Sequence, residues 1–208
     1  MADRTCSTAM RCFRDLPSVP LRVRAILLVL MAAACSGCGA TRIDLRYQPI
    51  VEGVQGSGRI VVCDLEDARP DKPVVVKYRS PIYTFRTIET GDGDVGKWVA
   101  DALASELRKA GFDVTRCGMP PKGGSEPAVT GRVSVLRLEE WPPTVTIRSE
   151  LLVVQQGKAA INAQFSGNYT DVRATATADK SYFEQMVQAA LQDLMIKAVP
   201  QIARSIGK

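Results

Sequence analysis

The side chains best able to do chemistry in this chain are its cysteines and its carboxylates. The 208 residues include six cysteines and no histidine. Histidine is the commonest general base and the commonest ligand of transition metals in proteins. Its absence excludes Ser-His-Asp hydrolysis and histidine-ligated zinc, so any reaction would have to use the remaining side chains.

Two of the cysteines, Cys35 and Cys38, follow a stretch that is typical of an export signal. Five arginines within the first 24 residues precede the apolar run Ala25–Ala34. This run is about half of the ~20 residues that a transmembrane helix needs, and the tract before it lacks the apolar period of a buried helix. We therefore expect residues 1–37 to be a cleaved lipoprotein signal peptide.

The lipid-accepting cysteine is either Cys38 or Cys35. Small residues precede both, and the three alanines directly before Cys35 give the more usual local pattern. Lipidation of Cys38 would leave Cys63 and Cys117 as the only thiols of the exported part, an even pair that suits an oxidising compartment. We favour Cys38 on this parity, while Cys35 stays a candidate.

Removal of the signal changes the charge of the protein. Residues 1–37 contain five arginines and two aspartates, so their loss lowers the formal charge from +5 to +2. The charges that remain alternate in sign and form no basic run longer than two residues. A weak and mixed charge of this kind gives no reason to expect a nucleic-acid partner.

The remaining patterns suggest no catalytic residue, no metal and no cofactor. The glycines between Gly91 and Lys97 superficially form a phosphate loop, but Asp92 and Asp94 stand among them and suit the capping of a helix better. A calcium ion would need about six to eight oxygens, more than these two carboxylates offer. Adjacent Glu139 and Glu140 would point to opposite faces of a strand and could not act as a facing pair.

Two further features could contact a partner or could be purely structural. Trp141 precedes two prolines and could present an aromatic surface to a partner, although we favour a role in covering the end of the core. The segment Asp67-Ala-Arg-Pro70 could carry a surface ion pair on a turn that Pro70 closes.

A strand-helix-strand unit should organise the first part of the domain. Arg59–Leu65 is a β-branched run bounded by turn residues and predicts a buried strand. Apolar residues from Val95 to Leu107 recur at helical spacing, with Glu106 and other charges placed off this stripe, and Gly111 should close the helix. A long crossover favours parallel neighbouring strands, so Cys63 and Cys117 could form a disulfide or stay as two thiols.

The later part of the chain predicts an antiparallel meander and a last helix. Residues 129–138, 144–154 and 159–169 alternate as strands do, and residues 73–90 predict two short strands or a covering loop. A capping box of Ser181 and Glu184 should start the last helix, and Pro200 should kink or end it. The expected fold class is α+β, a mixed sheet with the C-terminal helix on one face, as a single domain at 58–208 behind a lipidated tether at 38–57.

With this order of elements, the chain resembles the YajG-like lipoproteins. The residues that carry the resemblance are the leader, Asp67-Ala-Arg-Pro70, the helix Trp98–Leu107 and its closing Ala110-Gly-Phe112. The resemblance spans nearly all of the exported part and implies an outer-membrane lipoprotein without an assigned activity. The family's spacing from lipidated cysteine to first strand also favours Cys38.

These observations lead to the expectation of a non-enzymatic lipoprotein of the bacterial envelope. Its N-terminal diacylglyceryl cysteine would enter the lipid bilayer, and its domain would bind a protein partner in the envelope. Gly39 or Ser36 stands where an aspartate would retain the protein in the inner membrane, so we expect the periplasmic face of the outer membrane. The alternatives are an auxiliary subunit of a transport or envelope-assembly complex and an enzyme that uses carboxylates alone.

Overall fold

A computed structural model describes residues 41–70, 72, 74–79, 85–91, 93–119, 125–140, 142–172 and 179–206. Cys35, Cys38 and Trp141 lie outside these residues. The elements in chain order are β1 (Thr41–Ile43), β2 (Arg59–Cys63), β3 (Glu66–Asp67), β4 (Val74–Arg79), β5 (Phe85–Thr90), α3 (Val95–Lys109), β6 (Asp113–Cys117), β7 (Ala128–Glu140), β8 (Pro143–Gln155), β9 (Lys158–Thr170) and α4 (Lys180–Ile206).

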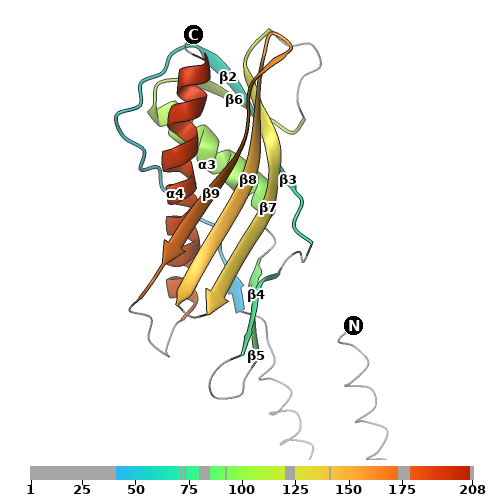
Figure 1. Cartoon of the computed structure of the whole chain (residues 1–208), viewed down its shortest axis with the longest axis vertical. Coiled ribbons are helices and arrows are strands. Elements are labelled where there is room, and N and C mark those ends of the chain that lie inside the picture. The colour runs from blue at the N-terminus through green and yellow to red at the C-terminus, as the bar shows by residue number, and fades with distance from the viewer. Residues whose placement is uncertain are drawn as a thin grey trace, which may run out of the picture. The chain divides into compact units, whose positions relative to one another are not determined.

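The main sheet has six strands, five of them in the order β6-β2-β7-β8-β9, with β3 paired to β7 (Figure 1). Strand β2 runs parallel to both β6 and β7, while β7, β8 and β9 form an antiparallel meander. The unit β2-α3-β6 is therefore the expected strand-helix-strand unit with parallel neighbouring strands. The predicted fold class, an α+β mixed sheet with a C-terminal helix on one face, is confirmed.

Helix α3 is fixed at both ends as its sequence predicts. The Asp94 carboxylate accepts the backbone N–H groups of Gly96 at 2.8 Å and Lys97 at 3.2 Å, which caps the first turn. Gly111 follows the helix with a φ of +102°, a conformation that glycine adopts at little cost. The carboxylate is thus used in capping.

The start of α4 differs from the predicted capping box. The Asp179 carboxylate, in place of Ser181, accepts the backbone N–H of Tyr182 at 2.9 Å, and the Ser181 hydroxyl donates to that same carboxylate at 2.8 Å. Glu184 reaches outward and accepts the backbone N–H of Asp44 at 2.8 Å. The box prediction is wrong because an aspartate two residues earlier is placed to cap the helix and a distant chain segment engages Glu184.

Helix α4 also continues past Pro200 to Ile206. A proline inside a helix removes one backbone hydrogen bond and normally costs about 3 kcal/mol. The nearby residues Val199 and Ile202 are fully buried. This apolar packing holds the last turns in place and offsets the loss, so the helix does not end at Pro200.

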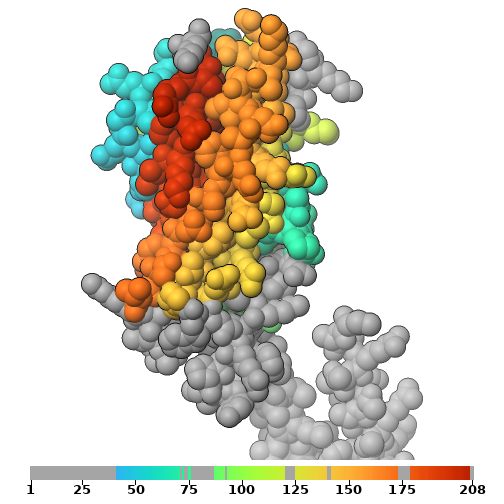
Figure 2. All heavy atoms as spheres, in the orientation of Figure 1, coloured from blue at the N-terminus to red at the C-terminus, as the bar shows by residue number. Residues whose placement is uncertain are grey.

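Both helices lie on one face of the main sheet and enclose one continuous core. Helix α4 covers β8 and β9, and α3 packs on β2, β3, β6 and β7. The backbones of α4 and β9 approach closely at Gly167, where a Cβ atom would lie 2.0 Å from the carbonyl oxygen of Ala190. Figure 2 shows the atoms of α4 lying against those of β9. Glycine at this position is what allows the contact.

The outer edge of β9 is covered by side chains of α4. The backbone N–H of Asn168 donates to the Asp193 carboxylate at 2.8 Å. The Lys197 ammonium donates to the carbonyl oxygen of Ser166 at 2.9 Å and to Asp193 at 2.6 Å. Backbone groups that would otherwise be unpaired at the sheet edge therefore have partners.

A second, three-stranded sheet has the order β1-β5-β4, with β1 parallel and β4 antiparallel to β5. The two strands β4 and β5 match one of the two predictions for residues 73–90. Strand β1 comes from the segment expected as a tether, yet its Ile43 is only 1% exposed, and farther along Gly56 donates its N–H to the carbonyl of Ala110 at 2.8 Å. Residues 41–57 therefore pack on the domain.

Within the described parts of the chain, none of the helices combines the length and apolar character that crossing a membrane would require.

Candidate binding groove

A disulfide links the first two parallel strands of the main sheet. Cys63 of β2 and Cys117 of β6 are directly paired in register, with 4.5 Å between their Cα atoms, and their sulfur atoms are bonded. Cys63 is fully buried and packs with Val61 and Ala128 in a small cluster apart from the main core. The parallel strand-helix-strand unit was expected to bring these two cysteines close together, and the structure shows them bonded.

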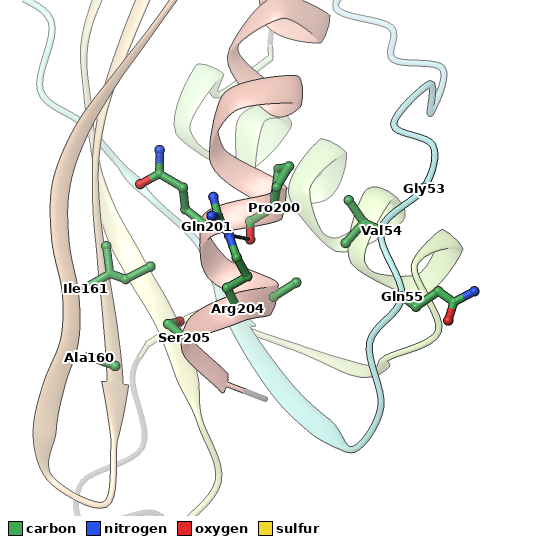
Figure 3. Close-up of a pocket in the computed structure, with 10 residues that line it drawn as sticks. Gly53, Val54, Gln55, Ala160, Ile161, Pro200, Gln201, Arg204 and Ser205 are labelled. Carbon is green, nitrogen blue, oxygen red and sulfur yellow. Dashed lines mark hydrogen bonds between the residues drawn. The ribbon is translucent and has the colours of Figure 1, made fainter. Parts of the chain in front are cut away.

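A large groove lies where α4 and β9 separate, at the C-terminal end of the helix (Figure 3). It has a volume of about 980 Å³ and is open to solvent. Three distant segments form it, namely the chain around Val54, the start of β9 and the last turns of α4. Its lining residues are Gly53, Val54, Gln55, Ala160, Ile161, Pro200, Gln201, Ala203, Arg204 and Ser205.

The chemistry of this groove suits binding. Arg204 is the one charged residue among the described side chains that line it, and its guanidinium donates to the carbonyl of Pro200 at 3.1 Å. The Ser205 hydroxyl donates to the carbonyl of Ile202 at 2.7 Å. Figure 3 shows Ile161 extending from β9 toward α4. An apolar wall beside a single cation can hold a ligand, but it offers neither an acid/base pair nor an activated nucleophile.

A second hollow, of about 650 Å³, lies at the start of α3 and has acidic walls. Each carboxylate there already has a partner. Asp94 caps the helix, Asp101 accepts from Arg116 at 2.9 Å, and Asp44 accepts from Lys180 at 2.9 Å. The hydrogen bond from Lys180 holds the pKa of Asp44 below its ordinary value. Across the described residues no group of three or more potential metal ligands occurs.

A buried ion pair joins Asp67 and Arg69, which were expected on a surface turn. Their side chains are only 9% and 4% exposed, and two hydrogen bonds of 2.8 and 2.9 Å connect them. Burial would raise the pKa of Asp67, but the Arg69 hydrogen bonds and charge outweigh it and lower the pKa below its ordinary value. The surface prediction is wrong because Glu66–Asp67 forms β3 and pairs with β7.

A second buried carboxylate, Glu106 of α3, holds the segment that follows β1. Glu106 is 1% exposed and accepts the backbone N–H groups of Ile50 at 2.8 Å and Val51 at 3.2 Å, as well as the hydroxyl of Tyr47. Burial of Tyr47, and next its hydrogen bond to Glu106, raise the pKa of the phenol well above its ordinary value. The placement of Glu106 among the charges off the apolar stripe is wrong, because it follows Leu103, Ala102 and Val99 by three, four and seven residues and so lies on the buried face of the helix.

The adjacent glutamates at the end of β7 form no site within the described residues. Glu139 is exposed and lies 3.8 Å from Arg137 of the same strand. The side chain of Glu140 lies outside the described part of the chain. The groove gave no local signal in the sequence because its members are far apart in the chain. The position of Glu106 within the apolar stripe of α3 was a signal for its burial, but not for its distant partners.

No protein-family model and no curated protein matches the sequence. Among solved structures, an uncharacterised protein is 16% identical with a TM-score of 0.50, covering 79% of this chain and 99% of that one. Protein XCC0632 from Xanthomonas campestris, described by the family DUF330, is 13% identical with a TM-score of 0.49 over 79% and 96% of the two chains. The PelC dodecamer from Paraburkholderia phytofirmans is 16% identical with a TM-score of 0.41 over 72% and 91%. At these identities the chain shares an α+β fold with the first of these proteins.

Proposed function

We propose that this chain is an exported lipoprotein of the bacterial envelope whose domain has a non-enzymatic binding role. Cys38, or else Cys35, carries the diacylglyceryl anchor after residues 1–37 or 1–34 are removed. The domain then lies on the periplasmic face of the outer membrane, because no aspartate follows either cysteine as an inner-membrane retention signal.

The disulfide is the observation that supports this proposal best. Cys63 and Cys117 are bonded to each other, and structural disulfides persist mainly in oxidising compartments such as the periplasm. The other four cysteines all lie within the first 38 residues. The choice of Cys38 leaves no further free thiol in the exported protein. Separately, the resemblance to YajG-like lipoproteins implies a distance from lipidated cysteine to first strand that Cys38 fits better.

The binding role rests on what the groove contains. It combines apolar side chains such as Ile161 and Val54 with the single cation of Arg204. The carboxylates of the acidic hollow are engaged in capping and ion pairs, and the buried carboxylates Asp67 and Glu106 have hydrogen-bond partners. The described residues therefore favour recognition of a partner over acid/base catalysis.

Labelling of growing cells with radioactive palmitate tests the anchor. The wild type should incorporate the label, Cys38→Ser should lose it, and Cys35→Ser should keep it. Cys12→Ser, a substitution in the same leader, is the matched control and should also keep the label. Persistence of the label in the double variant of Cys35 and Cys38 would show that the proposed anchor is wrong.

An auxiliary subunit of a transport or envelope-assembly complex is the second candidate. The open groove favours it because three separate segments form a surface that a protein segment could enter. A photo-crosslinking residue in place of Gln201, inside the groove, should then give a defined crosslinked product in intact cells. The same residue in place of Gln156, at the turn after β8, should give none. Equal products from both positions would argue against the groove as the contact site.

A further inference from the structure

We infer that one end of the domain faces the lipid surface, with Val172 and Tyr169 in contact with it. This end is formed by β1 with its neighbours β5 and β4, the first turn of α4 and the last residues of β9, and we call it the anchor end (Figure 1). The inference rests on the proposed lipid anchor with Cys38 as the lipidated residue, and it adds an orientation of the domain on the membrane.

The length of chain between the anchor and the fold sets this orientation. Three peptide units separate Cys38 from Thr41, the first residue of β1. Such a stretch spans at most about 11 Å when fully extended. Strand β1 is itself fixed, because it pairs with β5 and its Ile43 is 1% exposed. The start of β1 therefore cannot lie far from the membrane surface.

Hydrogen bonds show which other parts of the domain share the anchor end. The backbone N–H of Asp44, next to β1, donates to Glu184 of α4 at 2.8 Å, and its carboxylate accepts from Lys180 at 2.9 Å. Strand β1 contacts α4, and Figure 1 shows β1 and the start of α4 at the same end of the domain as the end of β9. The first turns of α4 are thereby held against β1.

The end of β9 is connected to the same turn of α4. Burial and then the charge of the nearby Asp171 carboxylate raise the pKa of Tyr182 to about 12. Asp171 donates its backbone N–H to the carbonyl of Pro143 at 2.9 Å. The start of β8 therefore lies at this end of the domain as well. The last residues of β9 and the first turn of α4 thus form one surface.

The anchor end exposes apolar side chains that the core does not use. Val172 is 84% exposed and Tyr169 is 38% exposed. Tyrosine is favoured at membrane interfaces because its ring is apolar and its hydroxyl reaches water. The charged side chains of the anchor end have both signs, since Arg46 and Lys180 both lie near Asp44. We therefore assign the lipid contact to the apolar side chains and the anchor, with no net contribution from charge.

The opposite end of the domain is then held well away from the lipid. Strand β9 has 13 residues, which span about 44 Å at ~3.4 Å per residue. Helix α4 has 27 residues, which span about 40 Å at ~1.5 Å per residue. The groove beside Arg204 and Ile161 lies at that far end, so a membrane-facing anchor end leaves it open to a partner in the periplasm.

Fluorescence quenching in vesicles tests the orientation. The mature protein with its lipid is placed in vesicles of phosphatidylethanolamine and phosphatidylglycerol that also contain a nitroxide-bearing lipid. One variant carries an environment-sensitive dye at Val172→Cys, and the matched control carries it at Gln156→Cys, at the other end of β9. We expect a blue-shifted emission and at least twofold stronger quenching at position 172 than at 156.

Equal quenching at the two positions, or stronger quenching at position 156, would overturn the inference. Flotation of the unlabelled protein with the same vesicles reports on the anchor by itself. Protein that fails to float contradicts the proposed lipoprotein function. Protein that floats without quenching at position 172 contradicts the orientation alone.

Discussion

The two halves of the domain are stabilised in different ways. In the half built from β2, α3 and β6, the strands have only five residues each. A disulfide links β2 to β6, the buried Asp67–Arg69 pair lies in the chain that follows β2, and Glu106 of α3 holds the segment that precedes β2. In the half built from β7, β8, β9 and α4, each strand has 13 residues and the helix 27. One apolar core runs through both halves, and in the short half it is accompanied by buried polar contacts and a disulfide.

The largest effect should come from breaking the buried ion pair. Asp67→Asn leaves Arg69 charged, buried and without its counterion, so the free energy of unfolding should fall by about 3–5 kcal/mol. Urea unfolding measures this value. The matched control is Glu139→Gln, an exposed carboxylate near Arg137, which should cost less than about 1 kcal/mol. Equal effects of the two substitutions would show that the buried Asp67–Arg69 pair does not stabilise the short half of the domain.

The same pair predicts how stability depends on pH. The folded-state pKa of Asp67 is lowered. Its carboxylate therefore binds fewer protons in the folded protein than in the unfolded chain. Its contribution is complete above the ordinary aspartate pKa of ~3.9 and is lost as the pH falls through the lower folded-state pKa. The difference in unfolding free energy between wild type and Asp67→Asn should therefore shrink in strong acid.

The long half should respond to a loss of apolar volume. Leu191 of α4 is fully buried, and Leu191→Ala should lower the free energy of unfolding by about 2–5 kcal/mol through the cavity it leaves. Ile196→Ala on the same helix is the control, because Ile196 is 51% exposed and should cost far less. A small effect at Leu191 would show that this half does not depend on its apolar core.

Removal of the disulfide should weaken the short half selectively. Cys63 and Cys117 are 54 residues apart, and closure of such a loop contributes about 4 kcal/mol in the chain-entropy model, with about 2–4 kcal/mol typical in practice. The double substitution to serine should lower protection from amide hydrogen exchange in β2 and β6 and spare β8 and β9. Uniform loss of protection would mean that the two halves unfold as one unit.

The smallest effect should appear in an alkaline titration of the five tyrosines. Burial and Glu106 keep the Tyr47 phenol protonated when folded, so the folded state binds more protons than the unfolded state above pH ~10. Stability should consequently fall as the pH rises above that value. Ultraviolet absorbance should show one phenol fewer with delayed ionisation in Tyr47→Phe than in the wild type, and an unchanged number would contradict the raised pKa of Tyr47.

Local patterns predicted much of the fold but little of the buried polar chemistry. The spacing from Val95 to Leu107 predicted α3, and the parallel crossover placed Cys63 near Cys117, because both follow from rules that act along one segment. The contact between Glu106 and Tyr47 joins residues 59 positions apart, which no periodicity reveals. Helical spacing in fact places Glu106 on the buried face of α3. Its charge favoured an exposed position, because the sequence does not show the distant segment that supplies its hydrogen-bond donors.

The candidate groove could not be predicted for the same reason. Val54, Ile161 and Arg204 come from three segments far apart in the chain, which are the stretch before β2, the start of β9 and the end of α4. The burial of Asp67 likewise depends on β3, a strand of two residues whose partner lies in β7. A segment so short carries no alternating pattern, and the prolines and charges around it favour a turn.

The ion pair that α4 places over the edge of β9 has a consequence for proteins crowded on a membrane. A bare strand edge is a template on which identical chains can pair and aggregate. Asp193 and Lys197 occupy the backbone N–H of Asn168 and the carbonyl of Ser166, so a neighbouring copy would have to displace a charged pair before it could add a strand. The helix thereby protects this stretch of the last strand from polymerisation.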